Sequence, residues 1–112
     1  MWAEQTLTLI KLAHTGIWAI MAGAIVAIPI AAMRRRFRLA AWLSALIVAE
    51  CIVLALNRGR CPLTDLAAGF TADRAANFDI FLPRWLAQNN KVLFGGLFVA
   101  GELLCVWRWL RR

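Results

Sequence analysis

The sequence predicts an all-α integral membrane protein: a bundle of three transmembrane helices plus an amphipathic, interfacial helical segment. Of its 112 residues, 62% are hydrophobic and 17% are charged, whereas a soluble domain is about half apolar and a quarter charged. A chain this short cannot bury so much apolar surface inside itself. Three apolar stretches, residues 12–33, 39–56 and 92–110, also have the roughly 17 to 25 residues that cross a hydrocarbon core of about 30 Å as a helix. We therefore expect one transmembrane domain over residues 1–112, covered by the lipid bilayer.

The first apolar stretch contains Pro29 within one turn of its end, where proline kinks a helix without interrupting its middle. A cleavable signal peptide is the alternative interpretation. However, Glu4 and Lys11 precede the stretch in place of a purely positive region, and the apolar run exceeds the roughly 7 to 15 residues of a signal peptide. We therefore expect this helix to be retained.

Basic side chains, which give the chain a net charge of +7, concentrate at two places that three crossings bring to one side of the membrane. They lie between the first two stretches and at the end of the chain: Arg34, Arg35, Arg36, Arg38, Arg108, Arg111 and Arg112. The positive-inside rule makes residues 34–38 and the C-terminus cytoplasmic, and the N-terminus and residues 57–91 external. A nucleic-acid patch is the alternative for the run at 34–38. Because a tight membrane loop accounts for that run, we expect no nucleic-acid partner.

The segment that follows the second stretch predicts short helices separated by turns. Asn57 ends the second helix, with Gly59 suited to a left-handed cap. A motif follows that consists of Cys61, Pro62, Leu63, Thr64 and Asp65. Because proline fits a first helical position, we expect a short helix there. Thr71 then offers an N-cap for a further helix.

Residues 75–88 predict a helix at the membrane interface. The apolar side chains recur at helical spacing and would share one face: Phe78, Phe81, Leu82, Trp85 and Leu86. Such a face suits insertion among lipid headgroups, and a lid packed over the helical bundle is an equal alternative. Pro83 leaves open a helix that starts near Leu82. A fourth embedded helix is less favoured, because Asp79 and Arg84 would be costly in its middle.

Three ionisable residues within the crossing stretches form the predicted intramembrane polar cluster: His14, Glu50 and Glu102. At about 1.5 Å per residue, His14 and Glu50 lie roughly 10 Å below the outer face and Glu102 roughly 16 Å. Buried carboxylates need a partner, a proton or a wet cavity. We therefore expect any chemistry at these three residues. The alternative is that each hydrogen-bonds locally and holds helices in register.

Small residues at a spacing of four form two rows that favour close approach of helices. The rows are Ala19, Gly23, Ala27 and Ala31 on the first helix, and Ala41, Ala45 and Ala49 on the second. His14 and Ala19 are about 140° apart around the first helix, so that helix needs neighbours on both sides. We infer a homodimer or contact with another membrane protein.

The chain has three cysteines, Cys51, Cys61 and Cys105. We expect free thiols, with a Cys51–Cys61 bridge as the alternative. The sequence contains no CxxC, HExxH, glycine-rich phosphate loop or nucleophile elbow. We therefore predict no metal site and no cofactor. A haem held by His14 or Cys61 as axial ligand is the one cofactor hypothesis.

The stretch Cys61-Pro62-Leu63-Thr64, preceded by His14 on the first helix, resembles an uncharacterised family, a domain of unknown function, of small bacterial inner-membrane proteins. The aromatic stretch 77–83, which ends in Leu-Pro, is similar to that family's segment, and the resemblance runs from His14 to Trp109. It implies a multi-pass helical protein of the bacterial inner membrane with about four helices. Because the family has no assigned activity, the resemblance concerns fold and compartment.

These features favour a scaffold, accessory or assembly subunit that binds a membrane partner through its outer segment. The alternative is a transport or proton-handling protein that uses His14, Glu50 and Glu102. A membrane redox protein with bound haem is a third hypothesis. An enzyme is the less favoured class, because the sequence contains no catalytic motif.

Overall fold

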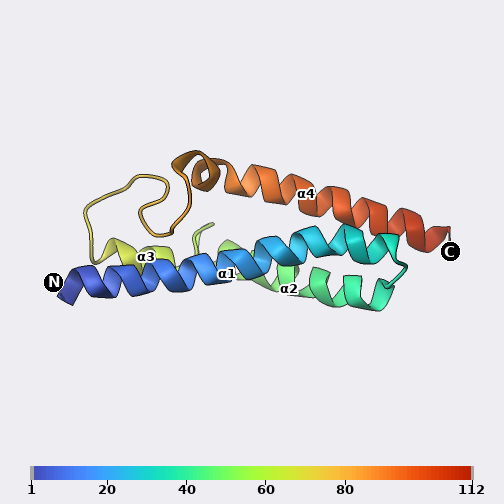
Figure 1. Cartoon of the computed structure of the whole chain (residues 1–112), viewed down its shortest axis with the longest axis horizontal. Helices are drawn as coiled ribbons and strands as arrows, with labels where there is room; N and C mark the ends of the chain where they lie inside the picture. Colours follow the sequence, from blue (N-terminus) through green and yellow to red (C-terminus); the bar gives the residue numbers. More distant parts are fainter. Residues whose placement is uncertain (1, 112) are drawn as a thin grey trace. The chain divides into compact units, whose positions relative to one another are not determined.

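A computed structural model describes residues 2–111, and its regular elements are helices (Figure 1). They are α1 (Trp2–Met33), α2 (Phe37–Leu56), α3 (Pro62–Ala68) and α4 (Arg84–Leu110). No β-strand occurs among the described residues, so the all-α prediction is confirmed. The helices α1, α2 and α4 are each long and apolar enough to cross a membrane, which agrees with the three predicted spans.

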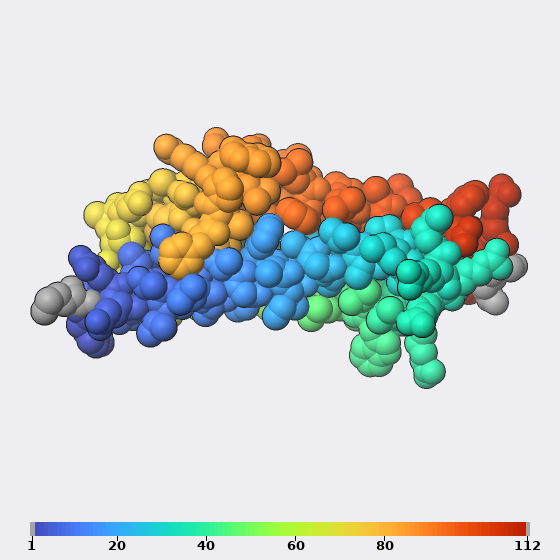
Figure 2. Space-filling view, in the orientation of Figure 1, coloured from blue at the N-terminus to red at the C-terminus, as the bar shows by residue number. Residues whose placement is uncertain are grey.

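The described residues form two compact units. Unit 1 contains residues 2–19 and 52–89, and unit 2 contains residues 20–51 and 90–111. The long helices each contribute to both units, whereas α3 and the irregular segment 71–83 belong to unit 1. Within unit 1, the yellow and orange atoms of α3 and this segment pack against the blue first half of α1 (Figure 2).

Helix α1 begins ten residues before the predicted stretch, because an apolar window marks only the part of a helix that suits lipid. The hydroxyls of Thr6, Thr8 and Thr15 donate to carbonyls four residues earlier, so these polar side chains are satisfied along the helix. Trp2 contacts Phe70 edge to face, with ring centroids 6.2 Å apart. The first turns of α1 are therefore held by unit 1 itself.

Two arginines in the left-handed conformation end the first two long helices. Arg35 has φ 57° after α1, and Arg58 has φ 59° after α2. The amide of the residue that follows each arginine donates to the carbonyl five residues earlier. The donor–acceptor distance is 2.8 Å for Arg36 and 2.6 Å for Gly59. This is the Schellman pattern. Gly59 is left-handed as predicted, with φ 79°, but the first left-handed position belongs to Arg58.

Residues 71–83 form turns, so the prediction of a further helix capped by Thr71 is wrong. The Thr71 hydroxyl accepts a hydrogen bond from the amide of Asp73 (3.1 Å), and the Asp73 carboxylate accepts one from the amide of Ala75 (2.9 Å). Such local bonds compete with helical backbone bonds. They close turns at this point of the chain.

The predicted helical face over residues 78–86 is also wrong for its first part. Phe78 lies in a turn and Phe81 and Leu82 in bends, and only Trp85 and Leu86 are helical. Pro83 marks the boundary, and α4 begins at the next residue, close to the alternative start near Leu82. The outer helix is therefore the first part of α4, which begins eight residues before the predicted 92.

Unit 2 has an apolar core formed by α1, α2 and α4. Its buried members are Ala24, Ile25, Ile28 and Ile47. Gly101 of α4 is buried against α1: a Cβ at this position would lie 3.3 Å from Cδ of Pro29 and 3.4 Å from Cγ2 of Ile28. The close contact between α4 and α1 therefore depends on the absence of a side chain at Gly101.

Candidate functional site

The first candidate site is a polar cluster in unit 1, defined by His14, Thr64 and Asp79. The Nδ1 atom of His14 lies 3.1 Å from the backbone oxygen of Asp79 and 3.5 Å from its carboxylate. Because both are hydrogen-bond acceptors, Nδ1 carries a hydrogen and donates it. The imidazole therefore binds α1 to the irregular segment, and Nε2 is the ring nitrogen left to coordinate a metal or haem iron.

Asp79 is the centre of this polar cluster. The residue is only 6% exposed, and its carboxylate accepts a hydrogen bond from the hydroxyl of Thr64 in α3. Burial of a carboxylate is costly unless hydrogen bonds satisfy it. One aspartate therefore links α3 to α1 through the irregular segment.

Two neighbouring contacts strengthen the attachment of this segment. The hydroxyl of Thr15 accepts the backbone N–H of Phe81 at 2.9 Å. The ammonium group of Lys11 lies 4.4 Å from the centroid of the Phe81 ring, within cation–π distance. Asn77 donates from Nδ2 to the carbonyl of Leu82 at 2.9 Å, which closes the last turn before Pro83.

The predicted motif 61–65 forms the start of α3. Pro62 occupies the first helical turn as predicted, and Cys61 stands at the N-cap. The carboxylate of Asp65 lies 3.1 Å from Nε of Arg60 and accepts a hydrogen bond from Asn57 at 2.9 Å. The motif therefore contributes Thr64 to the polar cluster, and Asp65 connects the start of α3 to the end of α2.

The polar cluster does not have the geometry of a nucleophilic triad. The hydroxyl of Thr64 donates to Asp79, so His14 does not accept its proton. Among the described residues, no three His, Cys, Asp or Glu side chains are grouped to hold a metal ion. The contacts of this cluster position backbone segments.

The three members of the predicted intramembrane cluster belong to different units. His14 lies in unit 1 with Asp79, whereas Glu50 and Glu102 lie in unit 2. Glu102 accepts a hydrogen bond from the hydroxyl of Ser44. Glu50 is half-buried, and within residues 2–111 it forms no hydrogen bond or ion pair.

Sequence reasoning missed Asp79 and Ser44 as partners, although each left a signal. Asp79 is the one acid in an aromatic stretch, between Phe78 and Ile80. Ser44 is the one hydroxyl side chain in the apolar stretch 39–56. A polar residue isolated among apolar neighbours is a candidate for a buried hydrogen bond.

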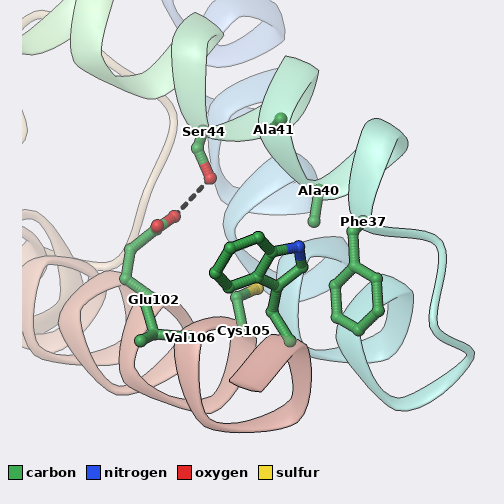
Figure 3. Close-up of a pocket in the computed structure, with 8 residues that line it drawn as sticks. Phe37, Ala40, Ala41, Ser44, Glu102, Cys105 and Val106 are labelled. Atoms are coloured by element: carbon green, nitrogen blue, oxygen red, sulfur yellow. Dashed lines mark hydrogen bonds between the residues drawn. The ribbon is translucent and has the colours of Figure 1, made fainter. Parts of the chain in front are cut away.

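The second candidate site, the α2–α4 pocket, lies in unit 2 and has a volume of about 440 Å³. Its lining residues come from the two helices: Phe37, Ala40, Ala41, Ser44, Glu102, Cys105, Val106 and Trp109. Figure 3 shows Glu102 reaching from α4 toward Ser44 on α2. This pocket therefore combines a carboxylate with apolar and aromatic walls.

Other polar groups of α4 in unit 2 are directed to α1. The thiol of Cys105 lies 3.9 Å from the carbonyl oxygen of Ile28. The guanidinium of Arg108 donates to the carbonyls of Ala32 (3.4 Å) and Met33 (2.9 Å) at the C-terminal end of α1. A cation at this position is favourable because the C-terminal end of a helix carries a partial negative charge. All three cysteines are free thiols.

The rows of small residues lie mostly on the surface of the chain. Ala19, Gly23, Ala41, Ala45 and Ala49 are exposed, Ala27 is half-buried and Ala31 is buried. A Cβ built at Gly23 would have no atom within 4 Å. Within the chain, α1 instead packs through the neighbouring Ala24, Ile25 and Ile28.

Comparison of the chain with protein-family models, with curated proteins and with solved structures found no match. The geometry of the two sites is therefore the basis on which a function is proposed.

Proposed function

We propose that this chain is a scaffold, accessory or assembly subunit of the bacterial inner membrane, with the outer segment, residues 57–91, as its contact surface outside the cytoplasm. The observation that carries the proposal is the polar cluster, in which His14 and Thr64 both bind Asp79. Their hydrogen bonds hold the irregular segment to α1 and α3. A loop that is already held in one conformation can bind a partner without the entropy cost of ordering the loop.

Exposed aromatic side chains of unit 1 support a contact role. Phe81 is 46% exposed and Trp85 is 62% exposed, and aromatic side chains are enriched at protein interfaces. The exposed members of the small-residue rows on α1 and α2 suit a second helix that approaches within the membrane. The partner is either a second copy of this chain or another membrane protein.

The resemblance to the uncharacterised inner-membrane family belongs to the same proposal. His14, the 61–64 stretch and the 77–83 stretch carry that resemblance, and the polar cluster draws one residue from each. In this chain, the three features therefore meet in one structural contact.

Site-specific photo-crosslinking tests the contact surface. A benzophenone amino acid in place of Trp85 should give a discrete protein adduct in cells, and the same probe in place of Val99 on α4 is the control. Asp79→Ala should weaken the Trp85 adduct because the irregular segment is released. A Trp85 probe that yields lipid adducts alone would contradict the proposal.

A second candidate function, transport or proton handling, is favoured by Glu102 alone. Its carboxylate lines a pocket between two helices that are apolar enough to span a membrane. Ionisable residues inside membrane-spanning segments often mark ion or substrate pathways. Reconstituted vesicles test this function. Wild type should carry an ion flux that Glu102→Gln abolishes, while gel filtration of the variant is unchanged.

A further inference from the structure

We propose that the α2–α4 pocket binds a lipid-soluble organic cation, whose charge is held by the carboxylate of Glu102. The inference rests on the second candidate function and names its ligand class. It concerns residues of unit 2 alone and is independent of the polar cluster.

The carboxylate of Glu102 has an incomplete set of partners. A carboxylate has about four acceptor positions, and among the described residues its side chain accepts one hydrogen bond, from Ser44. It forms no ion pair with any described cation. The nearest basic residues in the chain sequence are engaged elsewhere: Arg108 binds carbonyls of α1, and Arg111 stacks on Trp107. A positively charged ligand would supply the cationic partner that the Glu102 carboxylate lacks.

The pocket has walls and a volume that suit an organic cation. A volume of about 440 Å³ lies within the roughly 300 to 1,000 Å³ of small-molecule sites. Phe37 and Trp109 contribute aromatic rings, whose faces attract cations. Ala40 and Ala41 keep the α2 side of the pocket open because their side chains are small.

Two other occupants fit these walls less well. A bare metal ion needs several oxygen, nitrogen or sulfur ligands. The pocket offers one carboxylate, one hydroxyl and the thiol of Cys105, which lies against the carbonyl of Ile28, and no three His, Cys, Asp or Glu side chains among the described residues are grouped to hold a metal. A lipid acyl chain fills the apolar volume but supplies no donor to Glu102. An organic cation with apolar substituents satisfies both the carboxylate and the walls.

Equilibrium dialysis of the full-length protein in mild detergent tests the site. The probes are tetraphenylphosphonium, which has no N–H bond, protonated dibenzylamine, which has two, and neutral triphenylphosphine oxide. We expect saturable binding of at least one cation and at least tenfold weaker binding of the neutral compound. Equal binding of the neutral compound, or no cation binding, overturns the proposal. Binding of the amine alone shows that an N–H donor is required in addition to charge.

Variants separate the carboxylate from general effects. Glu102→Gln should weaken cation binding at least tenfold, whereas Glu50→Gln, a glutamate of unit 2 outside the pocket, should change it less than twofold. If Glu102→Gln does not fold, Ala41→Leu fills the pocket without touching the carboxylate and should weaken binding at least fivefold. Unchanged binding in Ala41→Leu overturns the proposal.

Measuring both cation binding and vesicle flux distinguishes failure of the binding site from failure of the transport function. Cation binding without flux in vesicles keeps the site and contradicts transport. A flux that depends on Glu102, without binding of either cation, keeps transport and overturns the inference.

Discussion

At the residue scale, the burial of Asp79 explains the choice of partners in unit 1. Its carboxylate is surrounded by an imidazole N–H and a hydroxyl, both of which donate to acceptors of the same residue. Removing the carboxylate leaves the hydroxyl of Thr64 without its partner, and a buried polar group without a partner costs about 1 to 3 kcal/mol. Asp79 is therefore the residue on which the attachment of the irregular segment most depends.

We predict that Asp79→Ala opens the segment 71–83. A loss of about 2 kcal/mol corresponds to roughly 30-fold more of the open form, and trypsin should cleave after Arg74 faster by a similar factor. The control is Asp73→Ala in the same segment, where an exposed turn bond is lost. Equal cleavage rates for the two variants would show that the polar cluster does not hold the segment.

The left-handed arginine after α2 gives a second prediction at this scale. A residue with a Cβ in the left-handed conformation destabilises the fold by roughly 1 to 2 kcal/mol. Glycine removes this strain, but part of the gain is offset because glycine gives the unfolded chain more conformational entropy. Arg58→Gly should therefore raise the free energy of unfolding by about 0.5 to 1 kcal/mol. Titration with sodium dodecyl sulfate, followed by circular dichroism, measures the change.

Arg58→Ala is the matched control for this change, because alanine removes the charge and keeps the Cβ. It should unfold at the wild-type concentration of detergent. A gain in Arg58→Ala equal to that in Arg58→Gly would assign the effect to charge, and the conformational explanation would fail.

At the element scale, proline and short side-chain bonds decide where helices begin, while apolar windows decide only which part suits lipid. Pro83 starts α4 far ahead of its apolar stretch, and Thr71 closes a turn in place of the expected helix. The periodicity of aromatic residues over 78–86 was compatible with a helix. Periodicity describes a face only if the backbone is helical, and Pro83 lacks the N–H that a helix interior needs.

We predict that Gly101→Leu destabilises the packing of α4 on α1. A larger side chain would overlap Pro29 and Ile28, and overpacking costs about 1 to 3 kcal/mol. Thermal unfolding in detergent should show a lower Tm for this variant. Gly95→Leu on the same helix is the control, since a Cβ there has no atom within 4 Å, and a Tm loss as large as that of Gly101→Leu would contradict the packing argument.

At the scale of the whole molecule, the distribution of apolar and basic residues argues for a multi-pass protein. Large apolar side chains such as Ile20, Ile52 and Leu103 are exposed on α1, α2 and α4, and a bilayer covers such surfaces. The turn between α1 and α2 is formed by consecutive exposed arginines, 34–36. Their charge supports the proposed cytoplasmic side of that turn.

Labelling of single cysteines, in a variant that lacks the three native cysteines, tests the predicted orientation. Ala76→Cys, in the exposed part of the irregular segment, should react with a membrane-impermeant maleimide in intact cells. Arg36→Cys should react only after the membrane is permeabilised. The reverse pattern would overturn the positive-inside assignment.

The fold class, the three long apolar helices and the start of α3 at Pro62 could be predicted from the sequence, because composition, run length and proline are local signals. The candidate sites could be predicted only in part. His14, Thr64 and Glu102 stood out as polar groups in apolar or motif positions, but the predicted grouping of His14 with Glu50 and Glu102 assigned no role to Asp79 or Ser44. Depth along a helix does not specify which neighbouring segment a side chain faces.

By itself, the sequence determined that this chain consists of helices suited to a membrane, because apolar runs of this length have one physical solution that satisfies every backbone group. The tertiary structure alone decided the partners: Asp79 for His14, Ser44 for Glu102, and α1 for Gly101. The contact between His14 and Asp79 joins residues 65 positions apart. Pairs at such separation meet because the folded chain brings their segments together, and neither periodicity nor local propensity specifies that meeting.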